Sequence, residues 1–275
     1  MPRPKRAPNP FPRPGRSFDS GAFTIIGDFI GVDECGRGSL AGPLCVCAVA
    51  IEPMVVSGVR DSKKISEKER ARLAALIRGH ATAWKIAEVP PNEIDRIGIQ
   101  PAWHKAVKAV VDEIRKETNK EVVVDGNVLP KDVNWVQAIP KADSCVYQVA
   151  AASILAKAHH DLVMQSLAAR FPEYGFEKHK GYGTKAHRQV LQKLGPSPVH
   201  RLTFWSVVSP EDPVNRDAVR GQVAVQSLDR CLDSGMLSGW EMDTLGEARE
   251  KIGAGKRLSS RQRFFVQAIL RRHGV

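Results

Sequence analysis

The chain has 275 residues, enough for one medium domain with an appendage or for two small domains. Hydrophobic residues make up 43% of it, which excludes a largely disordered protein and predicts a packed core. The formal charge of +11 favours a polyanionic partner, although a protein that is basic only for solubility has the same charge.

The N-terminal segment, residues 1–21, is predicted to be a disordered basic arm. Its first twenty residues hold six prolines and five Lys or Arg, with the first acid at Asp19. Such a segment cannot bury enough apolar surface to fold. Residues 22–208 then alternate between strand and helix patterns, which predicts one α/β domain with a mixed sheet flanked by helices.

The first strand pattern, residues 24–33, ends in a compact polar motif. Asp33 and Glu34 offer the hard oxygen ligands that Mg²⁺ or Mn²⁺ prefers. Gly36 and Gly38 remove side chains that would keep a ligand from the backbone. Arg37 adds a planar donor fork suited to a phosphate or sugar oxygen. The motif therefore predicts a metal-and-phosphate site, and its turn favours an antiparallel hairpin with the next strand, 43–52.

Further elements follow in chain order. Ser66 and Glu69 form a capping signature for a helix to about residue 78, before a strand at 81–89. Apolar residues at helical spacing predict a helix over roughly 99–117. Strands at 121–125 and 133–139 come next, and then a helix over about 144–169. The small residues Ala150 to Ser153 would let this last helix lie close against the sheet.

Two more acids join the first pair. Asp125 ends the strand 121–125, and Asp143 stands just before a predicted helix. Two metal ions about 3.5–4 Å apart need three or four carboxylates from different segments, and Asp33, Glu34, Asp125 and Asp143 meet that need. Alternatively, Asp143 caps the helix and Asp125 belongs to a turn with Gly126. Together, beside an acidic pair in a basic protein, they favour metal binding.

A second polar group spans residues 178–187. Glycines on both sides of Tyr182 let its ring stand clear of the backbone and stack on a sugar or base, although such a tyrosine is usually only a loop residue. The Lys and His side chains around it suit phosphate contact. Thr184 is predicted to cap a helix over 185–194. Residues 61–64 and 200–204 form two further basic clusters.

Residues 209–275 differ in character. Residues 209–213 read as a linker, and residues 216–273 as two or three short helices without strands. Six basic residues lie near the C-terminus with no acid among them: Lys256, Arg257, Arg261, Arg263, Arg271 and Arg272. This helical extension either contacts nucleic acid or a partner, or presents a basic face to solvent.

The compartment is predicted from what the sequence lacks. Its five cysteines are odd in number and have no metal-binding spacing, so a reducing compartment is favoured over a disulfide framework. No segment approaches the roughly 18–20 apolar residues of a membrane span, and Pro-rich residues replace the apolar run of a secretory signal. We expect a cytoplasmic protein with no membrane partner, and nothing demands more than a monomer.

Five motifs in order resemble ribonuclease HII, the type 2 ribonuclease H, over roughly residues 25–208. They are Gly31–Pro43, Asp61–Lys63, Val124–Gly126, Ala142–Asp143 with Ala150–Lys157, and His179–Lys185. The resemblance implies a ribonuclease H-like fold and a metal-dependent endoribonuclease. Its substrates would be the RNA strand of RNA–DNA hybrids and ribonucleotides embedded in duplex DNA, cut on the 5′ side to leave 3′-hydroxyl and 5′-phosphate ends.

The resemblance also implies roles for individual residues. Asp33, Glu34, Asp125 and Asp143 match the family's four metal-binding acids. Gly36, Arg37 and Gly38 match the turn that reads the ribose 2′-hydroxyl, which distinguishes RNA from DNA. Tyr182 matches the tyrosine that stacks on the sugar at the RNA–DNA junction. Lys63 and Lys180, in matched motifs, are expected to contact substrate.

Two residues depart from the family pattern, and two other functions stay open. Cys35 stands where the family usually has Ala, and Ser39 where it usually has Pro. Because both are small, we expect a change in turn stiffness rather than loss of activity. A junction resolvase or transposase of the same superfold would also use clustered carboxylates but needs no 2′-hydroxyl reader. A non-catalytic nucleic-acid-binding protein is disfavoured, because unpaired carboxylates beside a polyanion are costly without metal.

Overall fold

The computed structural model describes residues 23–25, 27–128, 136–204, 207, 225–254, 256, 258 and 260–274. The predicted arm at 1–21, the linker at 209–213 and the start of the strand at 133–139 lie outside these residues. So does Arg257, one of the six basic residues near the C-terminus.

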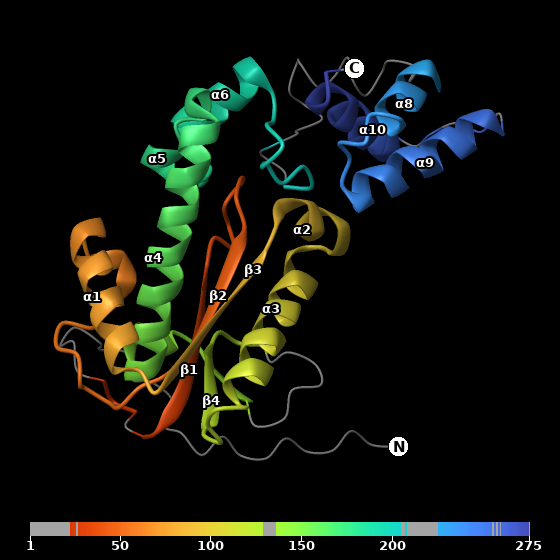
Figure 1. Cartoon of the computed structure of the whole chain (residues 1–275). Coiled ribbons are helices and arrows are strands. Elements are labelled where there is room, and N and C mark those ends of the chain that lie inside the picture. The colour runs from red at the N-terminus through yellow and green to blue at the C-terminus, as the bar shows by residue number, and fades with distance from the viewer. Residues whose placement is uncertain are drawn as a thin grey trace, which may run out of the picture. The chain divides into compact units, whose positions relative to one another are not determined.

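One mixed sheet of five strands has the order β3-β2-β1-β4-β5 (Figure 1). Its strands are β1 (Phe29–Cys35), β2 (Leu44–Ala50), β3 (Ala83–Val89), β4 (Glu121–Asp125) and β5 (Val136–Ile139). β1 and β2 are neighbours, as the glycine turn predicts. β1 pairs with β4 in parallel, with Val32 opposite Val124, and β4 pairs with β5 in parallel. The predicted mixed sheet is confirmed.

The helices of this part of the chain follow the local signals closely. They are α1 (Glu67–His80), α2 (Pro91–Ile97), α3 (Ile99–Ile114), α4 (Tyr147–Arg170), α5 (Phe176–His179) and α6 (Lys185–Leu194), with short 3-10 turns η1 (Ser62–Lys64), η2 (Ala142–Ser144) and η3 (Pro172–Tyr174). The Ser66 hydroxyl accepts the Glu69 N–H, and the Thr184 hydroxyl accepts the His187 N–H, so both predicted caps are confirmed.

Two helix boundaries differ from the predictions, and β1 begins at Phe29 rather than near residue 24. α3 ends at Ile114 rather than near residue 117, because a turn follows in which the Arg115 guanidinium donates to the Lys120 carbonyl. α4 begins at Tyr147, after η2 has already used Ala142–Ser144. Asp143 therefore lies inside η2 and does not cap α4, so the capping alternative is wrong.

α4 packs directly on the sheet, as its small residues predict. A Cβ built on Gly31 of β1 would lie 2.1 Å from the carbonyl carbon of Gln148 in α4. Ala150, Ala151 and Ala152 are fully buried. A strand glycine and helix alanines thus bring the two backbones into contact, which fixes the start of α4 beside the first half of β1.

The chain divides into two compact units, each discontinuous in sequence. The first consists of the described residues up to Glu34 with Cys47–Ile86 and Val107–Ala158; the second consists of Cys35–Val46, Ala87–Ala106 and the described residues from His159 onward. In the first, α1 and the start of α4 lie on one side of the sheet and the end of α3 on the other (Figure 1). Its core includes Phe29, Val123, Ile139 and Val149.

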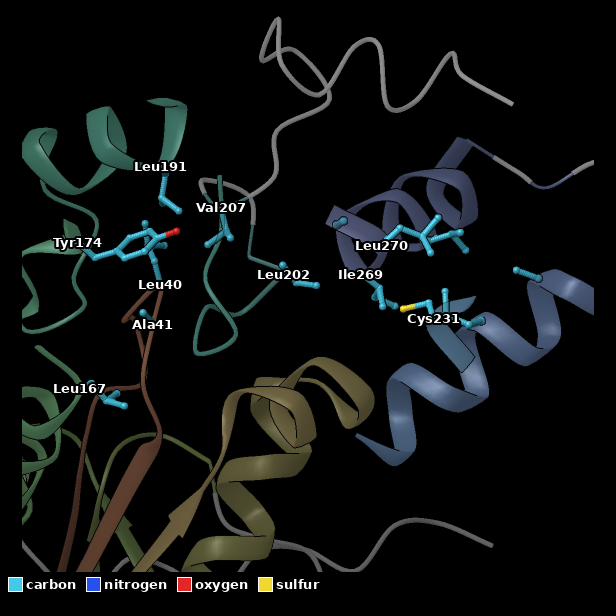
Figure 2. Packing of buried hydrophobic residues seen from close by; sticks show 14 of the residues in the cluster. Leu40, Ala41, Leu167, Tyr174, Leu191, Leu202, Val207, Cys231, Ile269 and Leu270 are labelled. Carbon is cyan, nitrogen blue, oxygen red and sulfur yellow. The ribbon is translucent and has the colours of Figure 1, made fainter. Parts of the chain in front are cut away.

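The second unit contains the predicted helical extension. It forms α8 (Val225–Leu232), α9 (Gly239–Gly253) and α10 (Ser260–Arg272), and no strand occurs among the residues described there. A capping box at Ser238 and Glu241 begins α9. Its apolar residues share a buried cluster with the residues that follow α6 (Figure 2). In the described part of the chain, no helix is both long and apolar enough to span a membrane.

Candidate active site

Parallel strands place two of the predicted acids side by side. Because Val32 of β1 pairs with Val124 of β4, Asp33 and Asp125 follow at adjacent positions where the two strands end. The Asp125 Oδ1 accepts the Ala142 N–H at 2.7 Å and so ties η2, with Asp143, to the end of β4. Glu34 is the next residue of β1 and is half-buried. All four predicted acids belong to the first unit.

Burial and the charges of neighbouring carboxylates raise the pKa of Asp33 and of Asp125. Burial raises the pKa of Asp33 well above its usual value, and the charges of Glu34 and Asp125 add to the effect. Hydrogen bonds from Ser153 and from the Glu34 N–H, the latter at 2.7 Å, partly oppose it. Burial and then the charge of Asp143 raise the pKa of Asp125 to about 6. The site therefore brings together carboxylates whose negative charges repel one another.

Lys63 is a cation close to these acids. Burial lowers the pKa of its ammonium, but the carboxylates of Asp143, Asp61, Asp33 and Asp125 outweigh that effect and raise it. Asp61 also caps η1 by accepting the Lys63 N–H at 3.0 Å. Ser62, between them, is buried and its hydroxyl lies 2.9 Å from that of Ser153. These hydrogen bonds hold η1 in place, and η1 carries Lys63 close to the acids.

The four acids have the right chemistry for a hard divalent cation, since every donor is a carboxylate oxygen. Their side chains do not converge on one point, since no group of three or more His, Cys, Asp or Glu among the described residues is arranged to hold a metal ion. Hydrogen bonds to the Glu34 and Ala142 N–H groups hold one oxygen each of Asp33 and Asp125. If these carboxylates share one ion, their side chains must rotate from the positions seen here.

The glycine-arginine-glycine turn lies in the second unit. Gly36 has a φ of +82°, and a Cβ there would lie 2.6 Å from the His160 ring, so only glycine fits. Gly38 is exposed, and a Cβ there would meet no atom within 4 Å. The Arg37 guanidinium donates to Gln100 Oε1 at 2.5 Å and lies 5.3 Å from the Trp103 ring centre. α3 therefore holds Arg37 in one orientation.

Tyr182 lies beside this turn. Its backbone pairs with Ser39, and the Leu40 N–H donates to the Gly181 carbonyl at 2.7 Å. The Tyr182 hydroxyl lies 3.6 Å from Cys35 Sγ. Burial and this thiol raise the pKa of Tyr182. The two residues that depart from the family pattern thus both contact the tyrosine, while Lys180 forms the left-handed turn just before it.

A model of the ribonuclease HII family matches residues 30–207, about two-thirds of the chain. This chain belongs to the ribonuclease HII family. It is an endoribonuclease that acts on RNA–DNA hybrids. The match ends before the helical extension, as the resemblance in the sequence predicted.

Relatives of known sequence or structure agree with this assignment. A ribonuclease HII of Hyphomonas neptunium is 44% identical over 201 residues, covering 68% of this chain and 96% of the relative. The ribonuclease HII in the structure of a PCNA:RNase HII complex from Archaeoglobus fulgidus is 28% identical, with a TM-score of 0.54 and coverage of 66% of this chain and 94% of that one. The ribonuclease H2 of Pyrococcus horikoshii is 25% identical, with a TM-score of 0.55 and coverage of 65% and 94%.

The predicted site residues of this ribonuclease HII fall into two groups. The four acids and Lys63 belong to the first unit, and Gly36, Arg37, Gly38, Lys180 and Tyr182 to the second. The peptide bond from Glu34 to Cys35 joins the two groups at the end of β1.

Three basic residues of the sequence motifs, expected on the surface near phosphate, are buried in this ribonuclease HII. His187, His200 and Arg201 have no exposed surface, so they cannot contact phosphate. The sequence held a signal for His187, because it falls one helical turn from Leu191 on the buried side of α6. It held none for His200 and Arg201. Sequence reasoning also missed Gln100 and Trp103, which orient Arg37.

Proposed function

We propose that this ribonuclease HII cuts duplex DNA on the 5′ side of an embedded ribonucleotide, leaving 3′-hydroxyl and 5′-phosphate ends. Asp33, Glu34, Asp125 and Asp143 would hold two divalent cations, Mg²⁺ or Mn²⁺. Gly36, Arg37, Gly38 and Tyr182 would select the ribonucleotide. Lys63 and Lys180 would contact the phosphate backbone.

The observation that carries the proposal is the adjacent register of Asp33 and Asp125 at the ends of two parallel strands. Divalent cations at such carboxylates activate a water and stabilise the leaving oxygen in phosphodiester hydrolysis. Burial and then repulsion raise the pKa of both acids, and bound cations would offset both effects, which supports the assignment. Cation binding would then draw the four side chains together.

Lys63 would act on the substrate through its charge. Its ammonium is exposed and stays protonated, because the neighbouring carboxylates raise its pKa. One ammonium cannot neutralise four carboxylates, so Lys63 would not replace the metal. It can pair with a substrate phosphate that approaches the acids.

The choice of a ribonucleotide would rest on the second unit. The open space at Gly38 lets a sugar approach the backbone of the turn, where N–H groups can bond to a 2′-hydroxyl. Gln100 and Trp103 keep the Arg37 guanidinium oriented for a neighbouring phosphate or sugar oxygen. The ring of Tyr182, with its hydroxyl beside Cys35, would stack on the adjoining sugar.

A cleavage assay with two duplexes tests this proposal. One duplex carries a single ribonucleotide, and the other has the same sequence in DNA alone; both are incubated with Mg²⁺ or with Mn²⁺. We expect cutting of the first duplex only, and none when EDTA is added. Equal cutting of both duplexes, or cutting of neither, would contradict the proposed selection of a ribonucleotide.

A further inference from the structure

Residues 200–203, here called the connecting segment, join α6 to the part of the chain that leads into the helical extension. We propose that the connecting segment, secured by Arg272 of α10, positions both Tyr182 and the Arg37 turn for ribonucleotide recognition. The inference rests on the proposed function. According to this inference, the helical extension, which lies outside the family match, contributes to substrate selection by holding the connecting segment in place.

The link to Tyr182 is a chain of hydrogen bonds through two imidazoles. The Ser197 N–H donates to His200 Nδ1 at 2.9 Å, so the proton of this ring is on Nε2. That Nε2 donates to His187 Nε2 at 2.9 Å, and His187 Nδ1 then donates to the Tyr182 carbonyl at 3.0 Å. Both rings are buried and neutral, because burial lowers the pKa of His187 to about 4 and that of His200 well below its usual value.

The link to the turn is the side chain of Arg201, which has no exposed surface. Its Nη1 donates to the Arg37 carbonyl at 3.1 Å, and its Nε and Nη2 both donate to the Gly42 carbonyl, at 3.0 and 2.9 Å. One guanidinium therefore bridges the start and the end of the segment 37–42. The backbone of Arg37 is thus fixed from the connecting segment, while its side chain is fixed from α3.

Two buried charged groups hold the connecting segment itself. The Asp95 carboxylate of α2 accepts the N–H groups of Leu202 and Thr203, each at 2.9 Å. Arg272 Nη2 donates to the His200 carbonyl at 3.3 Å, and its Nη1 donates to Glu241 Oε1 at 2.8 Å. The Arg272 and Glu241 side chains are only 3% and 5% exposed.

Apolar packing supports the same connection. Leu202 belongs to one buried cluster with Ile269 of α10, and in Figure 2 it reaches from the connecting segment toward the helices of the extension. Buried ion pairs add little net stability after desolvation, and their best-attested use is to specify one arrangement. Arg272 meets that description, since it reaches Glu241 of its own bundle and a backbone carbonyl of the connecting segment.

The first test is the Arg272→Lys variant. Lysine keeps a positive charge for Glu241 but has one nitrogen, so it cannot also reach His200 as the planar guanidinium does. We expect KM for a duplex with one ribonucleotide to rise about threefold to tenfold, the effect of losing one ordinary hydrogen bond, with kcat changed less than about twofold. The matched control is Arg249→Lys. It alters the exposed ion pair between Arg249 of α9 and Asp229 of α8, within the same helical extension, and should change neither KM nor kcat.

The second test separates positioning from folding. In His187→Asn, the amide nitrogen can replace Nδ1 as the donor to Tyr182, whereas His187→Ala has no donor. We expect KM to rise in the alanine variant and to fall only part of the way back in the asparagine variant, because its amide cannot also reach His200 Nε2. A full return to the wild-type KM would show that the bond from the connecting segment is not needed.

The outcomes distinguish the two proposals. Failure of the wild-type protein to cut the ribonucleotide duplex would contradict the proposed function. Normal cutting by the wild type, with KM unchanged in Arg272→Lys or raised equally in both His187 variants, would overturn only the inference about the connecting segment. If Arg272→Lys melts below the assay temperature, the His187 pair decides.

Discussion

The Asp125→Asn variant is expected to lose strand cleavage while it still binds substrate. Asparagine keeps the oxygen that accepts the Ala142 N–H but removes the negative charge needed to hold a divalent cation. The loss of rate should exceed the roughly 10- to 100-fold that follows removal of a group that only supports a metal ligand. Single-turnover cleavage with Mg²⁺ measures the rate, and fluorescence anisotropy of the labelled duplex measures binding.

Asp112 provides a matched control for the Asp125 variant. Asp112→Asn removes an exposed carboxylate of α3 that is paired with Lys108, so it should cleave like the wild type. Wild-type turnover by Asp125→Asn would remove Asp125 from the metal site. Equal losses in both variants would indicate a general effect of charge.

The same variant should be more stable than the wild type in EDTA at pH 7.5. The folded-state pKa of Asp125, about 6, lies above its ordinary value of 3.8, so the folded state binds this proton more tightly than the unfolded state does. Wild-type stability from this group therefore grows as pH falls from 7.5 through 6 toward 4. Asparagine carries no charge at any pH. The gap in melting temperature should accordingly narrow by pH 5, and a gap that widens would contradict the assigned pKa.

Gly31→Ala is expected to lower the stability of the protein strongly. Its Cβ would lie 2.1 Å from the Gln148 carbonyl carbon and 2.4 Å from the Val149 nitrogen, both backbone atoms of α4 that cannot rotate away. Overpacking in a close-packed interior costs about 1–3 kcal/mol, and contact with backbone places this site at or above the upper end. Urea denaturation monitored by circular dichroism measures the change.

Gly79→Ala is the matched control, because it makes the same chemical change in α1. Gly79 is exposed, and a Cβ there meets nothing within 4 Å. Alanine in a helix is favoured over glycine by about 0.5–1 kcal/mol, so this variant should be slightly more stable than the wild type. A Gly31→Ala protein as stable as the wild type would show that α4 does not rest directly on β1.

The parts of the fold that the sequence predicted depend on neighbouring residues. Ser66 and Thr184 begin helices because each hydroxyl accepts an N–H three residues on, an interaction that is complete within one turn. Asp33 and Asp125 could be placed at strand ends because buried apolar runs lead directly into them. That they stand side by side depends on the parallel pairing of β1 with β4, which the local pattern does not specify.

The parts that could not be predicted depend on residues far apart in the chain. His200 and Arg201 read as part of a basic cluster, yet both are buried. The ring of Tyr174 packs against His200, and the carbonyls of Arg37 and Gly42 accept hydrogen bonds from Arg201. The orientation of the Arg37 side chain needs Gln100, 63 residues further along. Charge and spacing say nothing of such contacts, which follow only from the packed fold.

The most direct test of the central claim is the chemistry of the ends produced from a duplex with one ribonucleotide. Mass spectrometry of both fragments identifies the position of the cut and the groups at its two sides. Attack by water at acids that hold divalent cations predicts a 3′-hydroxyl on one fragment and a 5′-phosphate on the other. The proposed function places the cut on the 5′ side of the ribonucleotide. A 2′,3′-cyclic phosphate, which forms when the ribose hydroxyl attacks instead of water, would contradict it.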